Sequence, residues 1–332
     1  MKKIGVIGAG SFGTALAQTL ADKGHSVRLT SVTRSHLEEM AESRENSRYL
    51  PGIKLNDNIE IAYSTEEALE GADIALFAAP AQKFRSAFEN AIPFLEDNMI
   101  VVNVAKGIEV GSLMRMSEIA KLLKPDTKYV VLSGPSHAEE IARKMPTTIV
   151  VASDHMEYAE EVQDVFMTER LRVYTNDDVC GVELGGALKN IIALGAGISD
   201  GIGYGDNAKA ALMTRGITEM CRLGKALGAD IATFAGLTGV GDLIVTCTSM
   251  HSRNRRCGIM IGEGLKPAEA VEKVGMVVEG MTTAEAAYEL ADRAGIEMPI
   301  TEAIYSCIKE KITAAEAVSL LMGRDRKNEK NI

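Results

Sequence analysis

The feature that most constrains this chain is a glycine-rich turn near its start. Gly8-Ala9-Gly10-Ser11-Phe12-Gly13 fits the pattern G-x-G-x-x-G, directly after the apolar run Ile4–Ile7 and directly before the helical stretch Ser11–Lys23. A strand, this turn and a helix within about thirty residues form the context that a dinucleotide-binding fold requires. The first glycine permits a tight turn, the second admits a pyrophosphate, and the third allows close packing of helix on strand.

The rest of the first half repeats the alternation of strands and helices. We expect strands at Val27–Thr30, Ile74–Ala78, Ile100–Ala105, Tyr129–Leu132 and Thr148–Ala152, and a short helix at Glu38–Ser43. Strands that are apolar on both faces, separated by helices, are typical of a doubly wound, mostly parallel sheet. The sequence thus predicts an α/β Rossmann domain over residues 1–180.

The second half has the 3.6-residue periodicity of helices. We expect helices at Val182–Gly195, Ala208–Leu227, Arg253–Gly262, Pro267–Val274, Thr282–Ala294, Pro299–Glu310 and Ala314–Leu321. Glycine and proline stand at their ends, as at helix termini generally. Residues 181–332 are therefore predicted to form an all-α second domain, in keeping with a chain of 332 residues.

Charge and composition narrow the function classes. The net charge of −10 disfavours nucleic acid and anionic membranes as partners. No run of ~18 apolar residues predicts a membrane span, and glycines interrupt the apolar run at the N-terminus, which disfavours a signal peptide. The five cysteines are widely spaced, which predicts free thiols in a reducing cytoplasm and no metal site.

The segment after the second predicted strand bears on the choice of cofactor. Enzymes that use NAD tend to place an acidic residue there, against the ribose 2′-hydroxyl. This chain has Thr30-Ser31-Val32-Thr33-Arg34 instead. Hydroxyl groups and an arginine suit a 2′-phosphate, so NADPH is predicted to bind at least as well as NADH. The alternative is that Arg34 is an ordinary exposed loop charge.

Polar loops follow three of the predicted strands, where ligands bind in doubly wound folds. These loops are Ala79–Gln82, Lys106–Gly107 and Ser133–Ala138. We expect them to line the same crevice as the glycine turn. Lys106 follows an otherwise apolar strand, and this position favours contact with a ligand over an unremarkable surface lysine.

The first helix of the second half contains a lysine in apolar surroundings. From Leu184 to Ala196 every residue except Lys189 and Asn190 is apolar or glycine. Burial lowers the pKa of a lysine and suits it to proton transfer. The alternative is a structural ion pair of Lys189 with Glu183.

A second polar group lies further along the chain. Asp242 stands among apolar residues and needs a partner if it is buried. Ser252, Arg253 and Asn254 follow at a predicted helix start, where hydroxyl, guanidinium and backbone N–H groups favour a phosphate or an oxyanion. An exposed basic turn is the alternative.

Together these segments resemble those of bacterial NAD(P)-dependent glycerol-3-phosphate dehydrogenases over nearly the whole chain. The most specific block is Gly241–Arg255, with Gly-Asp-Leu, Thr-Cys-Thr-Ser and Ser-Arg-Asn-Arg. The other matching segments are Gly8–Gly13, Asn46–Pro51, Asn103–Gly107, Ser133–Ala138, Glu183–Gly205, Thr233–Arg255 and Gly275–Gly280.

The resemblance implies reversible reduction of dihydroxyacetone phosphate to sn-glycerol 3-phosphate, which supplies phospholipid synthesis, by a homodimer. It implies that Lys189 is the catalytic acid and base. The implied substrate contacts are Lys106, Gly134, Ser136, Lys189, Asp242, Ser252, Arg253 and Asn254. The implied cofactor contacts are Gly8, Gly10, Ser11, Phe12, Gly13, Arg34, Tyr49, Lys106, Ala138, Arg253, Val277 and Glu279.

The chain departs from the family pattern at two places. The family often has a Trp-Ala-Arg-Arg-like run where this chain has Thr30–Arg34, and His137 stands where an aromatic residue is common.

Two other functions remain open from the residues. One is a β-hydroxyacid or 6-phosphogluconate type dehydrogenase, which Ser252–Arg255 disfavours. The other is a non-catalytic NAD(P)-binding protein, which Lys189, Asp242 and Arg253 disfavour.

Overall fold

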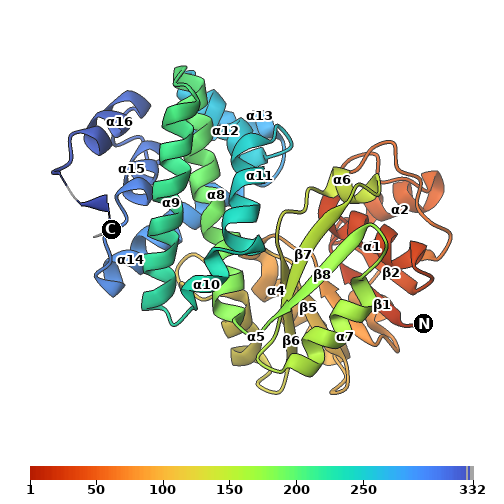
Figure 1. The fold of residues 1–332 in the computed structure, drawn as a ribbon. Helices are drawn as coiled ribbons and strands as arrows, with labels where there is room; N and C mark the ends of the chain where they lie inside the picture. The colour runs from red at the N-terminus through yellow and green to blue at the C-terminus, as the bar shows by residue number, and fades with distance from the viewer. Residues whose placement is uncertain (327, 330–332) are drawn as a thin grey trace. The chain divides into compact units, whose positions relative to one another are not determined.

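A computed structural model describes residues 1–326 and 328–329. The chain divides into two compact units (Figure 1). The first comprises Met1–Ala105 and Met116–Val182, and the second comprises Lys106–Arg115 and Glu183–Ile332. The prediction that residues 1–180 belong wholly to the first domain therefore differs from the structure at one short segment. Lys106–Arg115 belongs to the helical unit, where the Asn190 side chain donates a hydrogen bond to the Lys106 carbonyl.

The first unit is built on an eight-stranded sheet of order β3-β2-β1-β4-β5-β6-β7-β8. All neighbouring strands are parallel except β6 and β7, which are antiparallel. This confirms the predicted mostly parallel sheet. The strands are β1 (Lys3–Ile7), β2 (Ser26–Thr30), β3 (Ile59–Ile61), β4 (Ile74–Phe77), β5 (Ile100–Asn103), β6 (Lys128–Ser133), β7 (Thr147–Ala152) and β8 (Leu171–Asn176).

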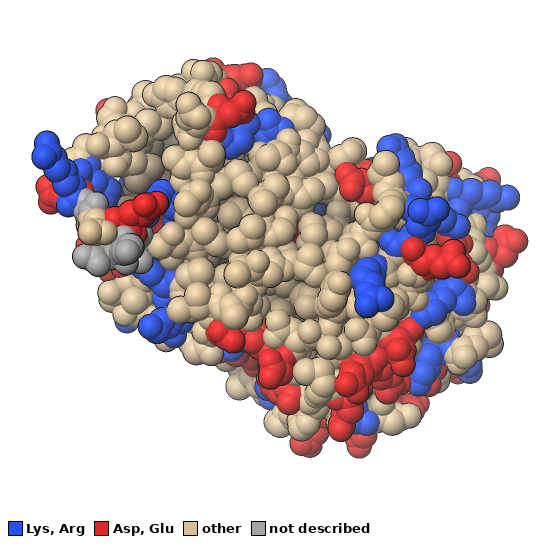
Figure 2. Space-filling view, viewed as in Figure 1, with Lys and Arg blue, Asp and Glu red and all other residues tan. Residues whose placement is uncertain are grey.

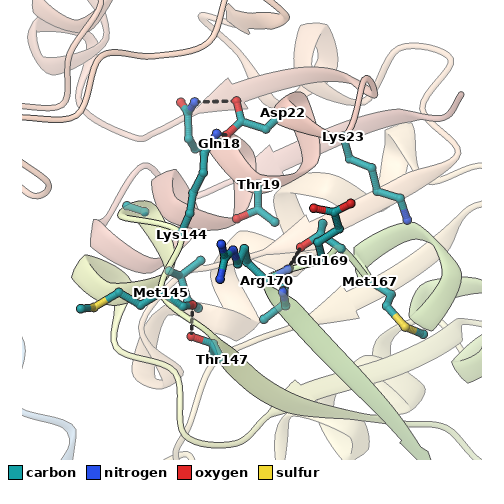
Figure 3. A pocket seen from close by; sticks show the side chains of 14 residues that line it. Gln18, Thr19, Asp22, Lys23, Lys144, Met145, Thr147, Met167, Glu169 and Arg170 are labelled. Carbon is teal, nitrogen blue, oxygen red and sulfur yellow. Dashed lines mark hydrogen bonds and ion pairs between the residues drawn. The ribbon is translucent and has the colours of Figure 1, made fainter.

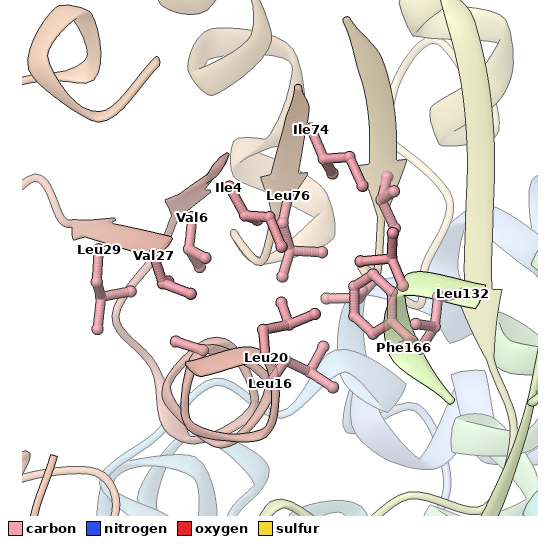
Figure 4. Close-up of a cluster of buried hydrophobic side chains, with 14 of the residues drawn as sticks. Ile4, Val6, Leu16, Leu20, Val27, Leu29, Ile74, Leu76, Leu132 and Phe166 are labelled. Atoms are coloured by element: carbon pink, nitrogen blue, oxygen red, sulfur yellow. The ribbon is translucent and has the colours of Figure 1, made fainter. Parts of the chain in front are cut away.

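Helices cover both faces of this sheet. Leu16 and Leu20 of α1 and Phe166 of α7 pack under the strands in one continuous buried cluster (Figure 4). Alternate strand residues face the other way, where Phe77 packs against α4. The helices are α1 (Ser11–Asp22), α2 (Arg34–Ser43), α3 (Thr65–Leu69), α4 (Ala81–Ala91), the 3₁₀ turn η1 (Ile92–Phe94), α5 (Met116–Leu123), α6 (Ala138–Ala142) and α7 (Met156–Phe166).

The second unit is helical, as predicted. Its elements are α8 (Val179–Ile202), α9 (Asp206–Ala226), α10 (Ile231–Phe234), the π-helical turn η2 (Leu237–Gly241), α11 (Asp242–Thr248), α12 (Arg253–Gly262), α13 (Pro267–Val274), α14 (Glu279–Ala294), α15 (Pro299–Ile308) and α16 (Ala314–Met322). The segment from Ile231 to Thr248 was not predicted to be helical, because its short turns break the regular 3.6-residue pattern.

Two helices of the second unit touch along their backbones. A Cβ atom added at Gly258 would lie 2.1 Å from the Leu194 carbonyl oxygen, and one added at Gly197 would lie 2.1 Å from the Arg255 carbonyl oxygen. Glycines four residues further along each helix make the same approach. Since no side chain fits between them, α12 is fixed closely against α8, and its first residues are held beside the middle of α8.

Two stretches are long and apolar enough to cross a membrane by length and composition, which differs from the prediction. They are Val179–Ile202 and Ile231–Thr248. The prediction missed them because glycines and a few polar residues interrupt the apolar runs. In α8, 94% of the apolar window is buried inside the protein, as expected for a central helix of a bundle, whereas the corresponding share of the second stretch is 44%.

Candidate functional site

The glycine turn links β1 to α1 in the first unit. Gly8 has φ of +119°, a conformation that L-residues rarely adopt. A Cβ atom at Gly13 would lie 2.0 Å from the Gly8 carbonyl oxygen, so the third glycine lets the helix start against the turn. Gly10 is different, because nothing lies within 4 Å of its Cβ position. The turn thus leaves open space at the one glycine that a bound pyrophosphate needs to approach.

The residues that follow the turn are held by a neighbouring segment. The Ser11 hydroxyl donates a hydrogen bond to the Tyr49 carbonyl oxygen at 2.7 Å. Phe12 packs against a small apolar cluster that includes Ala15 and Ala138. Four predicted cofactor contacts, Ser11, Phe12, Tyr49 and Ala138, are thereby brought together around the start of α1.

Arg34 begins α2, so the prediction that this helix starts at Glu38 was wrong by one turn. No acidic residue marks this start, and the hydroxyl-rich segment before it is typical of a loop. The Arg34 side chain is 72% exposed, pairs with Glu38 at 3.0 Å, and lies over the Tyr63 ring at 5.0 Å. The structure thus places an exposed guanidinium, paired with Glu38, beside an aromatic ring.

The loop after β6 contains Gly134 and Ser136, two predicted substrate contacts. Gly134 has φ of +118°, and the Ser136 hydroxyl donates to the Gly134 carbonyl oxygen at 2.8 Å. Both residues belong to the first unit, whereas the other predicted substrate contacts belong to the second.

In the second unit two lysine side chains form ion pairs with the same carboxylate, that of Asp242. The Lys189 ammonium lies 2.6 Å from Asp242 Oδ1, and the Lys106 ammonium lies 2.7 Å from Asp242 Oδ2. Lys189 also donates to the Thr246 hydroxyl at 2.7 Å. We call these four residues the lysine cluster. Asp242 is 1% exposed and Lys189 is 5% exposed.

Burial and neighbouring charges set the acidity of this cluster. The pKa of Lys189 is lowered to about 8, chiefly by burial. Asp242 raises this pKa and Lys106 lowers it, and the value of about 8 is the net result. Burial alone raises the pKa of Asp242, but Lys106 and Lys189 outweigh it and hold that pKa below its usual range. The cluster therefore has an ionised carboxylate between two cations and a lysine that can exchange a proton near neutral pH.

The turn η2 directly precedes Asp242 and places it beside Lys189 of α8. Asp242 is the first residue of α11, and Thr246 follows one helical turn later on the same face. A Cβ atom at Gly185 would lie 2.8 Å from the Thr238 carbonyl oxygen, so a glycine of α8 allows η2 to pack directly on the helix that contains Lys189. π-Helical turns within helices are frequent at functional sites.

Asn190, beside Lys189 on α8, connects the remaining predicted residues. It accepts a hydrogen bond from the Asn254 amide at 2.9 Å, and the Gly280 N–H donates to Asn254 Oδ1 at 2.8 Å. Glu279 is the first residue of α14 and Val277 precedes that helix, with a side chain that is 47% exposed. These bonds place the starts of α12 and α14 against Lys189's own helix.

Ser252 and Arg253 stand at the start of α12. The Ser252 hydroxyl oxygen caps the helix by accepting a hydrogen bond from the Arg255 N–H at 3.2 Å. Arg253 is the first helical residue and is partly exposed. A hydroxyl cap, a guanidinium and a helix N-terminus form the arrangement expected of a phosphate site.

The structure tests one of the two interpretations of Lys189, the ion pair with Glu183, while its role in proton transfer stays a prediction. Glu183 pairs with Arg115 at 2.9 Å, whereas Lys189 pairs with Asp242. The alternative of a structural Lys189–Glu183 pair is therefore wrong. Sequence reasoning missed Asn190 and Thr246 as members of the site, although the first adjoins Lys189 and the second lies one turn after Asp242.

A hollow of about 400 Å³ in the first unit lies elsewhere (Figure 3). It is bordered by the second half of α1 and by the segments that enter β7 and β8, and none of its lining residues is a predicted site residue. Lys144 pairs with Asp22 at 2.9 Å on its rim. Among the residues that the structure describes, no group of three or more His, Cys, Asp or Glu could hold a metal ion.

Family models match both halves of the chain. The N-terminal model of NAD-dependent glycerol-3-phosphate dehydrogenase matches residues 3–159, and the C-terminal model of the same family matches residues 178–319.

Full-length relatives agree with these matches. A glycerol-3-phosphate dehydrogenase [NAD(P)+] of Pelotomaculum thermopropionicum is 54% identical, over 98% of this chain and 95% of the relative. One of Clostridium perfringens is 50% identical over 99% of both chains. The crystal structure of glycerol-3-phosphate dehydrogenase from Coxiella burnetii superposes with a TM-score of 0.93 at 37% identity, covering 97% of this chain and 99% of that one. The chain belongs to the NAD-dependent glycerol-3-phosphate dehydrogenase family.

Proposed function

We propose that this protein catalyses the reversible reduction of dihydroxyacetone phosphate to sn-glycerol 3-phosphate with NADH or NADPH. The observation that supports it most is the lysine cluster, in which a buried Lys189 with a pKa of about 8 is held between Asp242 and Thr246. The names of the family and of the full-length relatives supply the substrate.

Lys189 is the proposed acid and base. The reduced nicotinamide, when bound, supplies the hydride to C2 of the ketone. As that bond forms, the carbonyl π electrons move to oxygen, and the Lys189 ammonium gives its proton to this oxygen. The products are the secondary alcohol, neutral lysine and oxidised cofactor. In the reverse direction neutral Lys189 takes the hydroxyl proton.

Asp242 and Thr246 hold the Lys189 ammonium in place. Asp242 accepts from Lys189 and Lys106 through different oxygens, so one carboxylate orients both cations. Because the lysine cluster contains one more positive than negative charge, it also stabilises the negative charge that develops on the ketone oxygen. Lys106 is thus proposed to contact substrate and cofactor.

The substrate phosphate is proposed to bind at the start of α12. Arg253 supplies a guanidinium, Ser252 and Asn254 supply polar side chains, and the helix N-terminus favours an anion. Gly134 and Ser136 are proposed as further substrate contacts from the first unit. We expect Arg253→Ala to raise KM for dihydroxyacetone phosphate about a hundredfold with a smaller effect on kcat, in line with a lost charge-assisted bidentate contact.

The cofactor is proposed to bind along the glycine turn, through Gly8, Gly10, Ser11, Phe12 and Gly13. The other proposed contacts are Arg34, Tyr49, Lys106, Ala138, Arg253, Val277 and Glu279. We further propose that NADPH is favoured, since Arg34 is exposed beside Tyr63 and no acid ends β2. Comparing KM for the two cofactors tests this preference, and a strong preference for NADH would contradict it.

One assay separates this function from its alternatives. The protein is mixed with NADPH and dihydroxyacetone phosphate, and the absorbance of the reduced nicotinamide is followed. Oxidation of NADPH is expected with dihydroxyacetone phosphate and not with the carbonyl precursors of β-hydroxyacids. In a second arm with NADP+, no reduction of the cofactor is expected with 6-phosphogluconate. Absence of turnover at every pH and with both cofactors would refute the proposal and favour a cofactor-binding protein without catalysis.

A homodimer is proposed for the assembly. The surface over α9 and α11 of the second unit shows few charged side chains in Figure 2, while Ile231, Val240 and Ile244 are exposed nearby. An uncharged surface with exposed apolar residues is typical of contacts between subunits. Light scattering during size-exclusion chromatography measures the mass directly. A reducing cytoplasm, where the product feeds phospholipid synthesis, is the proposed location, because none of the five cysteines, all of which the structure describes, forms a disulfide bond.

A further inference from the structure

His36 is a buried titratable group that the mechanism does not use. It lies on α2 and is 4% exposed. Its Nε2 atom lies 3.0 Å from Asn46 Oδ1, and its ring meets the Tyr49 ring edge-on at 5.2 Å. A buried imidazole in contact with a fully buried amide requires an explanation in terms of the groups that the amide holds.

Asn46 uses all of its hydrogen-bonding capacity. Its amide nitrogen donates to the Ala9 carbonyl oxygen at 2.9 Å and to the Thr14 hydroxyl at 2.7 Å. Its amide oxygen accepts from the Tyr49 N–H at 3.2 Å and faces His36 Nε2. Two donated and two accepted bonds saturate the carboxamide, which is 0% exposed.

This pattern fixes the proton on His36. A backbone N–H can only donate, so the atom of Asn46 that faces Tyr49 must be the oxygen. The same oxygen faces His36 Nε2, which must therefore donate as well. The ring is thus in a form with hydrogen on Nε2, and it acts on Asn46 as a donor.

The carbonyl that Asn46 holds belongs to the glycine turn. Ala9 lies between Gly8 and Gly10, and a carbonyl oxygen turned toward a pyrophosphate would repel it. The hydrogen bond from Asn46 keeps this oxygen directed into the protein. A second hydrogen bond, from the Ser11 hydroxyl to the Tyr49 carbonyl oxygen, links the glycine turn to the segment that contains Asn46. The turn is therefore fixed in shape before any ligand arrives, which reduces the ordering cost of binding.

We infer that His36 is a positioning residue for the cofactor, acting through Asn46 on the Ala9 carbonyl. The inference rests on the proposed function for the identity of the ligand. The part of His36 that this role requires is the hydrogen on Nε2, which is donated to Asn46 Oδ1. Position and donor matter, whereas the aromatic ring itself does not.

The test compares two amides at position 36. Glutamine places its Nε2 near the position of the imidazole Nε2, whereas asparagine is one methylene too short to reach Asn46. The matched control is His25→Asn, because His25 is a second buried histidine of the same unit, 8% exposed, whose Nδ1 accepts from the Lys2 N–H away from the turn. Dissociation constants for NADPH and NADH are measured by nicotinamide fluorescence without substrate, together with Tm, kcat and KM for dihydroxyacetone phosphate at saturating cofactor.

His36→Asn is expected to raise the dissociation constant of the cofactor about tenfold, the size of one lost hydrogen bond. His36→Gln should keep it within about twofold of wild type, and so should His25→Asn. The kcat and substrate KM should stay unchanged in all three.

Equal cofactor affinity in His36→Asn and His36→Gln would overturn the inference, as would an equal loss in His25→Asn. The proposed function fails separately, because it requires the unaltered protein to bind NADPH or NADH. If wild type binds neither, both proposals are wrong; if wild type and His36→Asn bind equally well, only the role of His36 is wrong.

Discussion

Gly10 of the first unit and the glycines between α8 and α12 of the second unit serve opposite purposes. In the first unit Gly10 faces open space, whereas in the second unit Gly258 and Gly197 face backbone oxygens at 2.1 Å. The glycine of the turn keeps room for a ligand that approaches the backbone. The glycines of α8 and α12 remove room, so that two helices meet and hold Asn254 against Asn190.

The two units also differ in the groups that they offer to a ligand. At the glycine turn of the first unit, backbone groups are the proposed contacts of the pyrophosphate. The second unit uses Gly197 and Gly258 for close helix packing and concentrates charge, with Lys106, Lys189 and Asp242 in one group. Binding and proton transfer should therefore respond to different substitutions.

The largest expected effect is the loss of proton transfer in Lys189→Met. The change keeps a long apolar side chain in a buried site but removes the ammonium. We expect kcat to fall about 10³-fold, within the range of general acid–base catalysis, while the dissociation constant of NADPH stays within about twofold. Steady-state kinetics and fluorescence titration measure the two quantities. Full turnover in this variant would show that another group moves the proton.

The second expected effect contrasts the two kinds of glycine. Gly258→Ala should destabilise the protein by about 3 kcal/mol, because its methyl group strikes the Leu194 carbonyl oxygen and forces α12 away from α8. Gly10→Ala should change stability by less than about 0.5 kcal/mol, since its methyl group points into open space. Urea unfolding measures both.

Cofactor affinity reverses this order. Gly10→Ala should weaken NADPH binding at least about tenfold, because the methyl group occupies the space of the pyrophosphate. If Gly10→Ala instead destabilises the protein as much as Gly258→Ala does and leaves NADPH affinity unchanged, the distinction between an open and a closed glycine is wrong.

A smaller effect concerns a buried charge of the second unit that takes no part in the lysine cluster. Glu219 is 3% exposed and accepts hydrogen bonds from the N–H groups of Ile300 and Thr301 at the start of α15. Burial raises its pKa to about 7. An acid whose pKa is raised by folding contributes stability at low pH that is lost as the pH rises to its folded value.

We therefore expect the Tm of wild type to fall by a few degrees, about 2–4 °C, between pH 5 and pH 7.5 relative to Glu219→Gln, which cannot ionise. The activity of the two proteins should stay alike. A pH dependence of Tm that is identical in both would show that Glu219 does not titrate in this range.

The fold could be predicted from the sequence because its signals are local. The turn Gly8–Gly13 predicted β1 and α1, and Arg253–Gly262 predicted α12 to the residue. The π-helical turn at Leu237–Gly241 could not be predicted, since it packs on Gly185 of α8, which lies far from it in the sequence. Lys106 belongs to the helical unit, where it contacts Asn190 and Asp242, and contacts between residues so distant in the sequence leave no local signal.

Likewise, some residues of the candidate site could be predicted from the sequence, whereas their pairing could not. Lys189 and Asp242 could be proposed because each is a charged residue in an apolar run. That they pair with each other, and that Glu183 pairs with Arg115, depends on helix packing that no periodicity encodes. Asn46 and His36 were missed as contributors, because a saturated amide has no signature in the sequence.

We propose that Lys189, with a pKa set by burial and by Asp242, is the group that gives and takes the proton. This proposal is tested most directly by the pH dependence of kcat/KM for reduction of dihydroxyacetone phosphate, in wild type and in Asp242→Asn. The reduction needs protonated Lys189, so the wild-type profile should fall above about pH 8. Because Asp242 raises the pKa of Lys189, its neutral replacement should move this fall to lower pH. A fall that stays at the same pH in both proteins would show that Lys189 paired with Asp242 is not the group that titrates.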